Sequence, residues 1–296
     1  MIRLGLCCIF RHQPIKFRRT TATYLSTLSS KDRAGRLSEI CLSNADNLMK
    51  ALIYCKNNGI GAFRINSQIL PLKTHPDLGY DMISLPDGEK IMEHFKKCGR
   101  FCKKNNIRTS FHPDQFIVLS SPHEDVVKRS VSDLEYHAQV AKWVNADVIN
   151  IHAGGVYGDK RSSVKRLQKT FHRLSNAVKS RLTLENDDKS YTPEDLLPIC
   201  KELDVPMVYD VHHHRCLKDS LSIDQATELA IETWNREPLF HVSSPLNGWN
   251  AKDIRKHHDY IDIRDFPSNW RNLDITVEVE AKAKEDAIFK LLKELN

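Results

Sequence analysis

The sequence lacks the features that mark membrane, nucleotide-binding and serine-hydrolase proteins. No apolar run approaches the roughly 18 residues that a membrane span needs. Neither G-x-G-x-x-G nor a P-loop occurs, so we expect no nucleotide cofactor. A catalytic Ser-His-Asp triad remains an alternative, but no G-x-S-x-G motif supports it. There is also no repeat, low-complexity tract or linker, which favours a single domain over residues 1–296.

The eight cysteines form no C-x-x-C pair and are irregularly spaced. Cys98 and Cys102 are four residues apart in a predicted helix, which places them on one helix face and not in a zinc knuckle. The apolar opening MIRLGLCCIF is short and fits a first barrel strand better than the core of a signal peptide. We therefore expect reduced thiols and an intracellular protein.

Charge permits an anionic partner without requiring one. The net charge is +6, with 44 Lys and Arg against 38 Asp and Glu, and the hydrophobic share of 41% is ordinary for a globular enzyme. Basic residues cluster within 11–19 and again at Lys160, Arg161, Lys165 and Arg166. Both clusters follow predicted strands, so both could flank a site at the strand ends.

Short β-rich runs alternate with amphipathic stretches along the chain. Strands are predicted at 2–7, 62–65, 107–112, 147–152, 181–185, 206–210, 239–242 and 276–280. Helices are predicted at 36–57, 89–104, 124–144, 164–180, 193–203, 223–232 and 284–295, and residues 10–33 are predicted to be a loop. Eight strands alternating with helices favour an α/β fold of the (β/α)8 TIM-barrel type over a doubly wound sheet.

Potential metal ligands stand at or just after the ends of most of these strands. They are His112, His152, Glu185, Asp210 with His213 three residues later, His241 and Glu280. Parallel barrels gather the carboxyl ends of their strands on one face, where active sites lie. Converging imidazoles and carboxylates suit a cluster of divalent cations, and the repeated placement is hard to explain as packing.

Each ligand also has a simpler explanation when it is taken alone. Glu185 ends a buried strand, where a carboxylate needs a partner; it is the best candidate for a shared ligand, or else it pairs with Lys189 or caps a helix. His112 and His152 could be buried histidines bonded to carbonyl groups. Of the three histidines at 212–214 only some can face inward; we choose His213 and leave the other two as supporting or exposed residues.

The remaining histidines are placed differently. His94, His137 and His172 fall within predicted helices, where solvated or packing roles fit better. His75 follows the second strand and either lines the site or forms a turn before Pro76. The strand-end set suits phosphodiester hydrolysis, in which bound cations neutralise the phosphate, lower the pKa of a water and stabilise the leaving oxygen.

Seven motifs together resemble the UV damage endonucleases. They are SFHPDQF, INIHAGGVYG, LTLENDDKSYT, VYDVHHH, HVSSP, HHDYID and VEVEAKAKE, and the resemblance covers essentially the whole chain in order. It implies a TIM barrel related to endonuclease IV that cuts double-stranded DNA immediately 5′ to a UV photoproduct, leaving 3′-hydroxyl and 5′-phosphate ends. It also implies up to three divalent ions, typically manganese, with zinc, cobalt or magnesium as alternatives. A monomer would suit a barrel that grips a duplex.

The resemblance assigns residues as well. The ligands it implies are His112, His152, Glu185, Asp210, His213, His241, His257 and Glu280, with His257 preferred to His258 on the family's H-x-D-Y-I pattern. Glu185, Glu280 and Asp210 would be the catalytic carboxylates. Gln115 and Phe116 would be inserted into the duplex at the lesion, unless Phe116 belongs to the core with its apolar neighbours. His75, Lys160 and Arg161 complete the predicted DNA contacts.

Two positions depart from the family pattern, and three rival functions remain. Leu6 stands where some members have an aromatic residue, and Leu239 stands where some have a lysine, so we expect no contribution from a modified lysine. The nearest rival is an endonuclease IV-like enzyme acting at abasic sites. A metal-dependent sugar isomerase on the same barrel and a lesion-binding protein with a structural metal are more remote.

Overall fold

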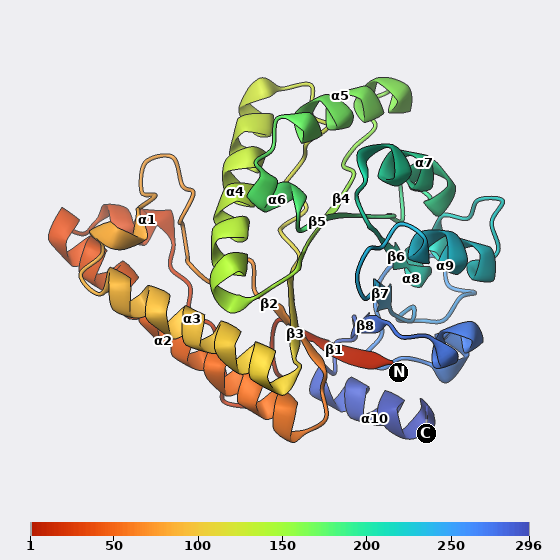
Figure 1. Cartoon of the computed structure of the whole chain (residues 1–296), viewed down its shortest axis with the longest axis horizontal. Coiled ribbons are helices and arrows are strands. Elements are labelled where there is room, and N and C mark those ends of the chain that lie inside the picture. The colour runs from red at the N-terminus through yellow and green to blue at the C-terminus, as the bar shows by residue number, and fades with distance from the viewer. Residues whose placement is uncertain (1, 296) are drawn as a thin grey trace.

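The computed structural model describes residues 2–295, so Met1 and Asn296, the ends of the predicted domain, lie outside the described residues. Eight parallel strands close into a barrel in sequence order, from β1 to β8, and helices surround them (Figure 1). The (β/α)8 prediction is therefore confirmed. The strands are β1 Arg3–Cys7, β2 Ala62–Ile65, β3 Arg108–Phe111, β4 Val148–His152, β5 Leu182–Glu185, β6 Met207–Asp210, β7 Leu239–Val242 and β8 Thr276–Val279.

The strands are buried on both sides because one side faces the barrel interior and the other faces the helices. Every residue of β2, β3 and β5–β8 is buried. β1 closes the barrel by pairing with both β2 and β8. The N-terminal strand therefore lies close to α10, the last helix (Figure 1). The barrel consequently has no free sheet edge.

The helical layer contains ten α-helices and three 3-10 turns among residues 2–295. They are α1 Ala22–Ser26, α2 Ser30–Asn57, α3 Gly88–Asn105, α4 Glu124–Val144, α5 Lys160–His172, α6 Asn176–Lys179, α7 Pro193–Leu203, α8 Val211–Cys216, α9 Ile223–Ile231, α10 Glu285–Leu295, η1 Met82–Ser84, η2 Ile263–Asp265 and η3 Ser268–Asn272. None of these helices combines the length and apolarity required to span a membrane.

Local capping explains which helix boundaries were predictable. α7 begins with a capping box between Thr192 and Asp195 and has Pro193 in its first turn, so its predicted bounds are confirmed, as are those of α4. The predicted loop at 10–33 was wrong, because it contains α1 and the first turn of α2. The Ser29 hydroxyl accepts a hydrogen bond from the Asp32 N–H and starts α2 six residues earlier than expected.

Two further helices differ from the prediction. The helix expected at 164–180 is two helices, α5 and α6, because Asp159 and Ser175 each cap a separate helix start. α8 was not predicted; it begins immediately after β6 and carries the three consecutive histidines. This short helix decides which way each of those imidazoles points.

Candidate metal centre

The predicted ligands meet at the carboxyl end of the barrel. His152 and Glu185 are register neighbours on β4 and β5, and Asp210 and His241 are register neighbours on β6 and β7. His112 follows β3 directly. Because neighbouring strands present register partners side by side, the barrel brings these side chains together without any long loop.

Glu185 lies at the middle of this cluster and is 1% exposed. Its Oε2 is 2.9 Å from Nε2 of His112 and accepts a hydrogen bond from the Asn150 amide. Its Oε1 is 3.1 Å from Nδ1 of His241 and 3.4 Å from Nδ1 of His213. Asn150 is itself held by a 2.9 Å hydrogen bond from Thr183, which fixes the direction of its amide.

Two groups of side chains can each hold a cation, and both contain Glu185. One is His112, His152 and Glu185, and the other is Glu185, Asp210 and His213; within each group the ligand atoms lie within 4.8 Å of one another. A carboxylate with one oxygen available to each group is the geometry expected of a bridging ligand. The alternative that Glu185 merely pairs with Lys189 has no support, because Lys189 is exposed and the carboxylate is surrounded by imidazoles.

Two buried polar atoms in these groups have no hydrogen-bond partner. They are Oδ2 of Asp210 and Nδ1 of His152. The other oxygen of Asp210 accepts the backbone N–H of His213 at 2.8 Å, and Asn186 holds the Asp210 backbone through two hydrogen bonds of 2.9 Å. Buried polar atoms in folded proteins are almost always satisfied. Oxygen and imidazole nitrogen donors of this kind fit a divalent cation such as manganese or zinc.

Glu280 and His257 extend the centre beyond the two groups. Glu280 follows β8, and its Oε2 lies 3.6 Å from Nδ1 of His257. The ring of His258 is engaged elsewhere, since its Nδ1 accepts the backbone N–H of Tyr260 at 3.0 Å. The geometry therefore places His257, and not His258, beside the Glu280 carboxylate.

The neighbours of His213 on α8 are both buried, so the alternative that they are exposed is wrong. His214 lies between the Tyr209 hydroxyl at 2.7 Å and Asp219 at 2.9 Å. His212 packs between the rings of Trp249 and His257, at 5.2 Å from each, and neither of its nitrogens has a hydrogen-bond partner. His212 therefore contacts the proposed centre through the His257 ring, whereas His214 is held by Tyr209 and Asp219.

The charges of the cluster are strongly coupled. Burial alone would raise the pKa of Glu185, but the imidazoles of His241, His152 and His112 outweigh it and hold that pKa well below its ordinary value. Burial alone would lower the pKa of His241, yet the Glu185 carboxylate raises it to about 10. Without a cation, the protonated His241 imidazole thus offsets the negative charge of Glu185.

Arg64 and Glu278 belong to the same cluster and were missed by the sequence analysis. Nε of Arg64 lies 2.5 Å from Glu278, its Nη1 lies 2.6 Å from Glu280, and its Nη2 lies 2.8 Å from Nε2 of His241. The alternation in VEVE was the available signal, since residues two apart in a strand point to the same side. This alternation predicts that Glu278 and Glu280 both face the barrel interior.

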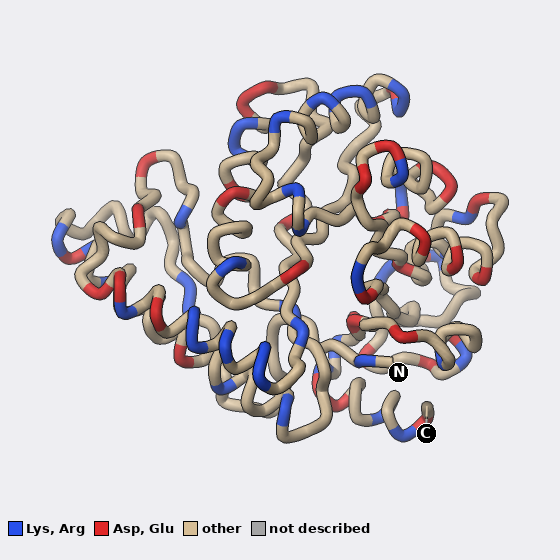
Figure 2. The backbone as a smooth tube through the Cα atoms, in the orientation of Figure 1, with Lys and Arg blue, Asp and Glu red and all other residues tan. Residues whose placement is uncertain are grey.

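The residues predicted to contact DNA differ in their surroundings. Phe116 is 74% exposed, so the alternative that it is core is wrong, and Gln115 beside it is exposed too. Arg161 is exposed, whereas Lys160 is paired with Asp195 at 2.7 Å. Figure 2 shows the basic residues that follow one another along α5. The ring of His75 accepts two backbone N–H groups at 3.2 Å, which is the turn role considered for it.

The loop after His152 is packed onto the loop that carries Phe116. Gly154 has a φ of +90°, and a Cβ there would lie 2.7 Å from Oγ of Ser120. Ser120 donates to the Ala153 carbonyl at 2.9 Å, and Arg166 donates to the Ser120 carbonyl at 2.7 Å. Arg166 also lies over the ring of Tyr157, an exposed aromatic residue with a φ of +49°. The sequence analysis placed Arg166 in a basic cluster that could flank the site, but it did not single out Tyr157.

The two residues that depart from the family pattern do not lie among the proposed ligand atoms. Leu6 is fully buried in the core on β1, and Leu239 packs with Val148 and Val208. Leu239 is two residues before His241 on the same strand, so it lies beneath that imidazole in the barrel. An apolar layer thus underlies the polar cluster at this point.

Comparison with known proteins agrees with this architecture. The crystal structure of SacUVDE matches with a TM-score of 0.88 at 29% identity, covering 100% of this chain and 98% of that chain. Endonuclease IV from Thermus thermophilus matches with a TM-score of 0.60 at 14% identity, covering 99% and 97%, which shows the fold alone.

Sequence comparison is more specific. The UV DNA damage endonuclease of Bacillus velezensis is 34% identical over 303 residues, covering 98% of this chain and 91% of that protein. The family model described as UV-endonuclease UvdE matches residues 2–296. The chain therefore belongs to the UvdE family of UV endonucleases.

Proposed function

We propose that this protein is a metal-dependent endonuclease that hydrolyses double-stranded DNA immediately 5′ to UV photoproducts, leaving 3′-hydroxyl and 5′-phosphate ends. The observation that carries the proposal is Glu185, shared by two ligand groups in which a buried Asp210 oxygen and a buried His152 nitrogen lack hydrogen-bond partners. Membership of an endonuclease family supports the reaction class, and the name of the Bacillus velezensis relative supports UV-damaged DNA as the substrate.

The predicted ligands divide among as many as three cation positions. His112 and His152 would hold one cation with Glu185, while Asp210 and His213 would hold another with the same carboxylate. His241, His257 and Glu280 would complete the set, with manganese favoured because imidazoles accompany the carboxylates. Bound divalent cations would neutralise the phosphate, lower the pKa of a water and stabilise the leaving oxygen.

The residues of this chain bind and orient the substrate around that centre. Glu185, Glu280 and Asp210 supply the negative charge that retains the cations. Phe116, exposed on the loop after β3, would enter the duplex with Gln115 and fill the gap left by displaced bases. Arg161 would contact a phosphate, His75 would do so through Nε2 while its Nδ1 keeps the turn, and Lys160 would exchange Asp195 for a phosphate when DNA binds.

The cellular location and the oligomeric state of the protein are part of the same proposal. A DNA repair enzyme acts inside the cell, and the eight cysteines are all free, as expected of reduced thiols. We propose a monomer, since one barrel face carries all the predicted ligands and DNA contacts. Sedimentation of the protein with and without a lesion duplex would measure that state.

The decisive experiment compares three labelled duplexes, with and without manganese. One contains a pyrimidine dimer, one an abasic site, and one is undamaged. A manganese-dependent cut immediately 5′ to the dimer is the expected result. Cutting only at the abasic site would place the activity with endonuclease IV, and no cut on any duplex would reopen the sugar-isomerase and binding-protein functions.

Salt dependence provides a second check on the substrate. If basic side chains touch phosphates, affinity for the duplex should fall steeply as salt rises, because bound counterions are released. Arg161→Ala should reduce the slope of log affinity against log salt by about 1 if Arg161 contacts one phosphate. A flat response would contradict DNA as the substrate.

A further inference from the structure

Tyr157 is an exposed aromatic residue in the loop between β4 and α5, and neither the proposed ligand set nor the proposed DNA contacts include it. Its side chain is 47% exposed, and its backbone φ of +49° lies in the left-handed region. A bulky residue in that region is strained, because its Cβ comes too close to the following carbonyl oxygen. The loop thus holds a large side chain in an unfavourable conformation while leaving about half of it in contact with solvent.

The backbone around Tyr157 forms a type I′ turn. The Asp159 N–H donates to the Val156 carbonyl at 2.9 Å, and the two residues between them have φ values of +49° and +80°. Such turns strongly favour Asn-Gly, because both central residues must be left-handed. The sequence V-Y-G-D has the expected glycine, Gly158, but a tyrosine where asparagine would cost less. Local backbone preference therefore does not explain Tyr157.

The turn is held from both sides. The Ser163 hydroxyl donates to the Val156 carbonyl at 2.7 Å, and Asp159 caps the start of α5. The guanidinium of Arg166 lies over the Tyr157 ring, 5.7 Å from its centre. A strained residue persists only where its surroundings fix it, and such residues cluster at sites that clamp ligands. Tyr157 is therefore held in place on the surface before any ligand binds.

The same contacts join Tyr157 to the segment that carries Phe116. Arg166 donates through Nε to the Ser120 carbonyl at 2.7 Å and through Nη2 to the Ser163 hydroxyl at 2.8 Å. The two loops follow β3 and β4, which are paired strands. Both exposed aromatic rings consequently belong to loops at the carboxyl end of the barrel, where the proposed ligands converge.

Basic residues follow the turn on α5. Arg161, Lys165 and Lys169 are exposed at intervals of four residues, so they form one basic ridge along the helix (Figure 2). Proteins bind unstacked nucleic acid with this combination: an aromatic ring stacks on a base, and cations follow the phosphates. Every base has a face on which a ring can stack, so the contact requires a displaced base and no particular sequence.

We propose that Tyr157 stacks on an undamaged nucleobase displaced from the duplex at the lesion, while the basic ridge of α5 follows the adjoining phosphates. The bases of a pyrimidine dimer have lost their 5,6 double bonds and are no longer flat, so a neighbouring or opposite base suits the ring better. Phe116 would fill the gap in the duplex, and Tyr157 would receive a base that has left it. The inference rests on the proposed function, since only a damaged or opened duplex offers such a base.

Tyr157→Asn separates the ring from the turn. Asn-Gly is the preferred pair for a type I′ turn, so the melting temperature should stay the same or rise. Affinity for a pyrimidine-dimer duplex, measured by fluorescence anisotropy in chelator so that no strand is cut, should fall by roughly 5–150-fold, the loss of one base stack. Affinity for the undamaged duplex should change much less, because its bases stay paired. Unchanged affinity for the dimer duplex would overturn the proposal.

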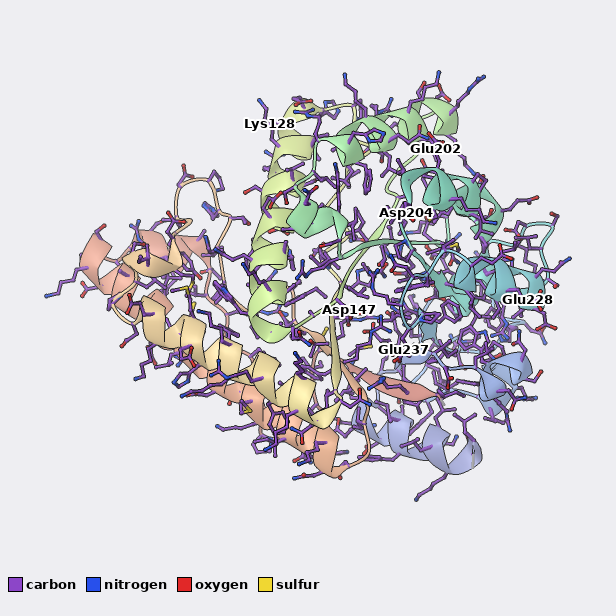
Figure 3. All side chains as sticks on the ribbon, in the orientation of Figure 1. Lys128, Asp147, Glu202, Asp204, Glu228 and Glu237 are labelled. Carbon is purple, nitrogen blue, oxygen red and sulfur yellow. The ribbon has the colours of Figure 1, made fainter. Side chains whose placement is uncertain are left out.

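Two further variants control for the backbone. Tyr157→Phe keeps the ring and the strain, and it should bind the dimer duplex as the unaltered protein does. Asp204→Asn alters another exposed residue with a left-handed φ, +53°, which lies before β6 at the opposite end of the barrel (labelled in Figure 3). It should leave both affinities unchanged. A loss in Asp204→Asn as large as that in Tyr157→Asn would contradict a base stack at Tyr157.

The fluorescence of 2-aminopurine reports the stacked base directly. This adenine analogue is bright when unstacked and is quenched when an aromatic ring stacks on it. It is placed in turn opposite the dimer and on either side of it. At one position or more, the complex with Tyr157→Asn should be brighter than the complexes with the unaltered protein and with Tyr157→Phe. Equal brightness at every position would overturn the proposal.

Failure of this inference and failure of the proposed function are distinguishable. If the unaltered protein binds the dimer duplex more tightly than Tyr157→Asn does but cuts no duplex with manganese, only the nuclease proposal falls. If the unaltered protein cuts the dimer duplex and Tyr157→Asn binds that duplex equally well, only the role of Tyr157 falls. A protein that binds neither duplex would overturn both.

Discussion

Oδ1 of Asp210 accepts the backbone N–H of His213 at 2.8 Å, while Oδ2 of the same carboxylate is buried without a hydrogen-bond partner. Asp210 is thus the N-cap of α8 with one oxygen and faces the proposed centre with the other. The cap also fixes the start of the helix that carries His213. One side chain therefore couples the local fold of α8 to the geometry of the ligands.

Asp210→Asn should separate these two tasks. The amide oxygen can still cap α8, so the free energy of unfolding without metal should change little, whereas Asp210→Ala should cost about 0.5–2 kcal/mol more through loss of the cap. Metal affinity should fall in Asp210→Asn by more than the roughly 10–100-fold typical of an outer partner. Denaturant titration and calorimetry measure the two effects, and normal metal binding would remove Asp210 from the ligand set.

Glu185→Gln should abolish nicking, because both ligand groups lose the carboxylate that they share. Metal content, measured on the purified variant, should fall at both positions together and not at one alone. Glu202→Gln, an exposed carboxylate on α7 that is labelled in Figure 3, is the control and should behave as the unaltered protein does. Near-normal turnover of Glu185→Gln would refute the bridging role.

The convergence of the strand-end side chains was predictable because it depends mainly on the topology of the barrel. Once Glu185, Asp210 and His241 are recognised at the ends of parallel strands, closure of the barrel brings them together whatever the loops do. The same reasoning located His112 and His152. The bounds of α4 and α7 also followed from sequence, although only α7 has a local capping box at its start.

Arg64 and Glu278 were not predictable in this way. Their role depends on which side chains oppose them across the barrel interior, which is set by register and by the space at Gly5. The burial of His212 and His214 depends on α8, whose start is set by the Asp210 side chain. α1 is only five residues long and Leu25 is its buried residue, so the segment is too short to show a helical periodicity in the sequence.

Cation binding should release protons and strengthen as pH rises. The Glu185 carboxylate raises the pKa of His241 to about 10, so without a cation His241 is protonated at neutral pH. A metal ligand must be deprotonated, and below that pKa each cation must therefore displace the proton. If one proton leaves, apparent affinity should increase by about tenfold per pH unit up to that pKa.

Calorimetry in two buffers of different ionisation enthalpy measures the protons released. The observed enthalpy should differ between the buffers in proportion to that number. Identical enthalpies at pH 7 would contradict a protonated His241, as would an affinity for manganese that does not change between pH 6 and pH 8.

Phe116→Ala should weaken the preference for damaged DNA without affecting the metal centre or the fold. The ring is 74% exposed, so its removal should change the free energy of unfolding by no more than about 0.5 kcal/mol. Loss of base stacking should cost roughly 1–3 kcal/mol in binding to a dimer duplex and much less for undamaged DNA. Ile83→Ala, 77% exposed on η1, is the control. Unchanged discrimination would leave Phe116 without a role at the lesion.

Gly154→Ala should disturb the loop that links His152 to the Phe116 segment. Gly158 serves as the control, because it also has a positive φ, +80° against +90°, but an added methyl group there would have nothing within 4 Å. Gly158→Ala should therefore cost only the left-handed strain of about 1–2 kcal/mol. At Gly154 the added Cβ would also lie 2.7 Å from Oγ of Ser120 and 2.8 Å from Cγ1 of Val118, which neither residue can easily avoid.

The larger loss should therefore appear in Gly154→Ala, both in the free energy of unfolding and in discrimination between dimer and undamaged duplexes. The second effect is expected because Ser120 and Val118 belong to the segment that carries Phe116, and displacing them moves that ring. Metal affinity should stay close to normal, since the proposed ligand His152 precedes the glycine on a paired strand. Equal destabilisation by the two alanine substitutions would show that contact with Ser120 and Val118 is not what constrains position 154.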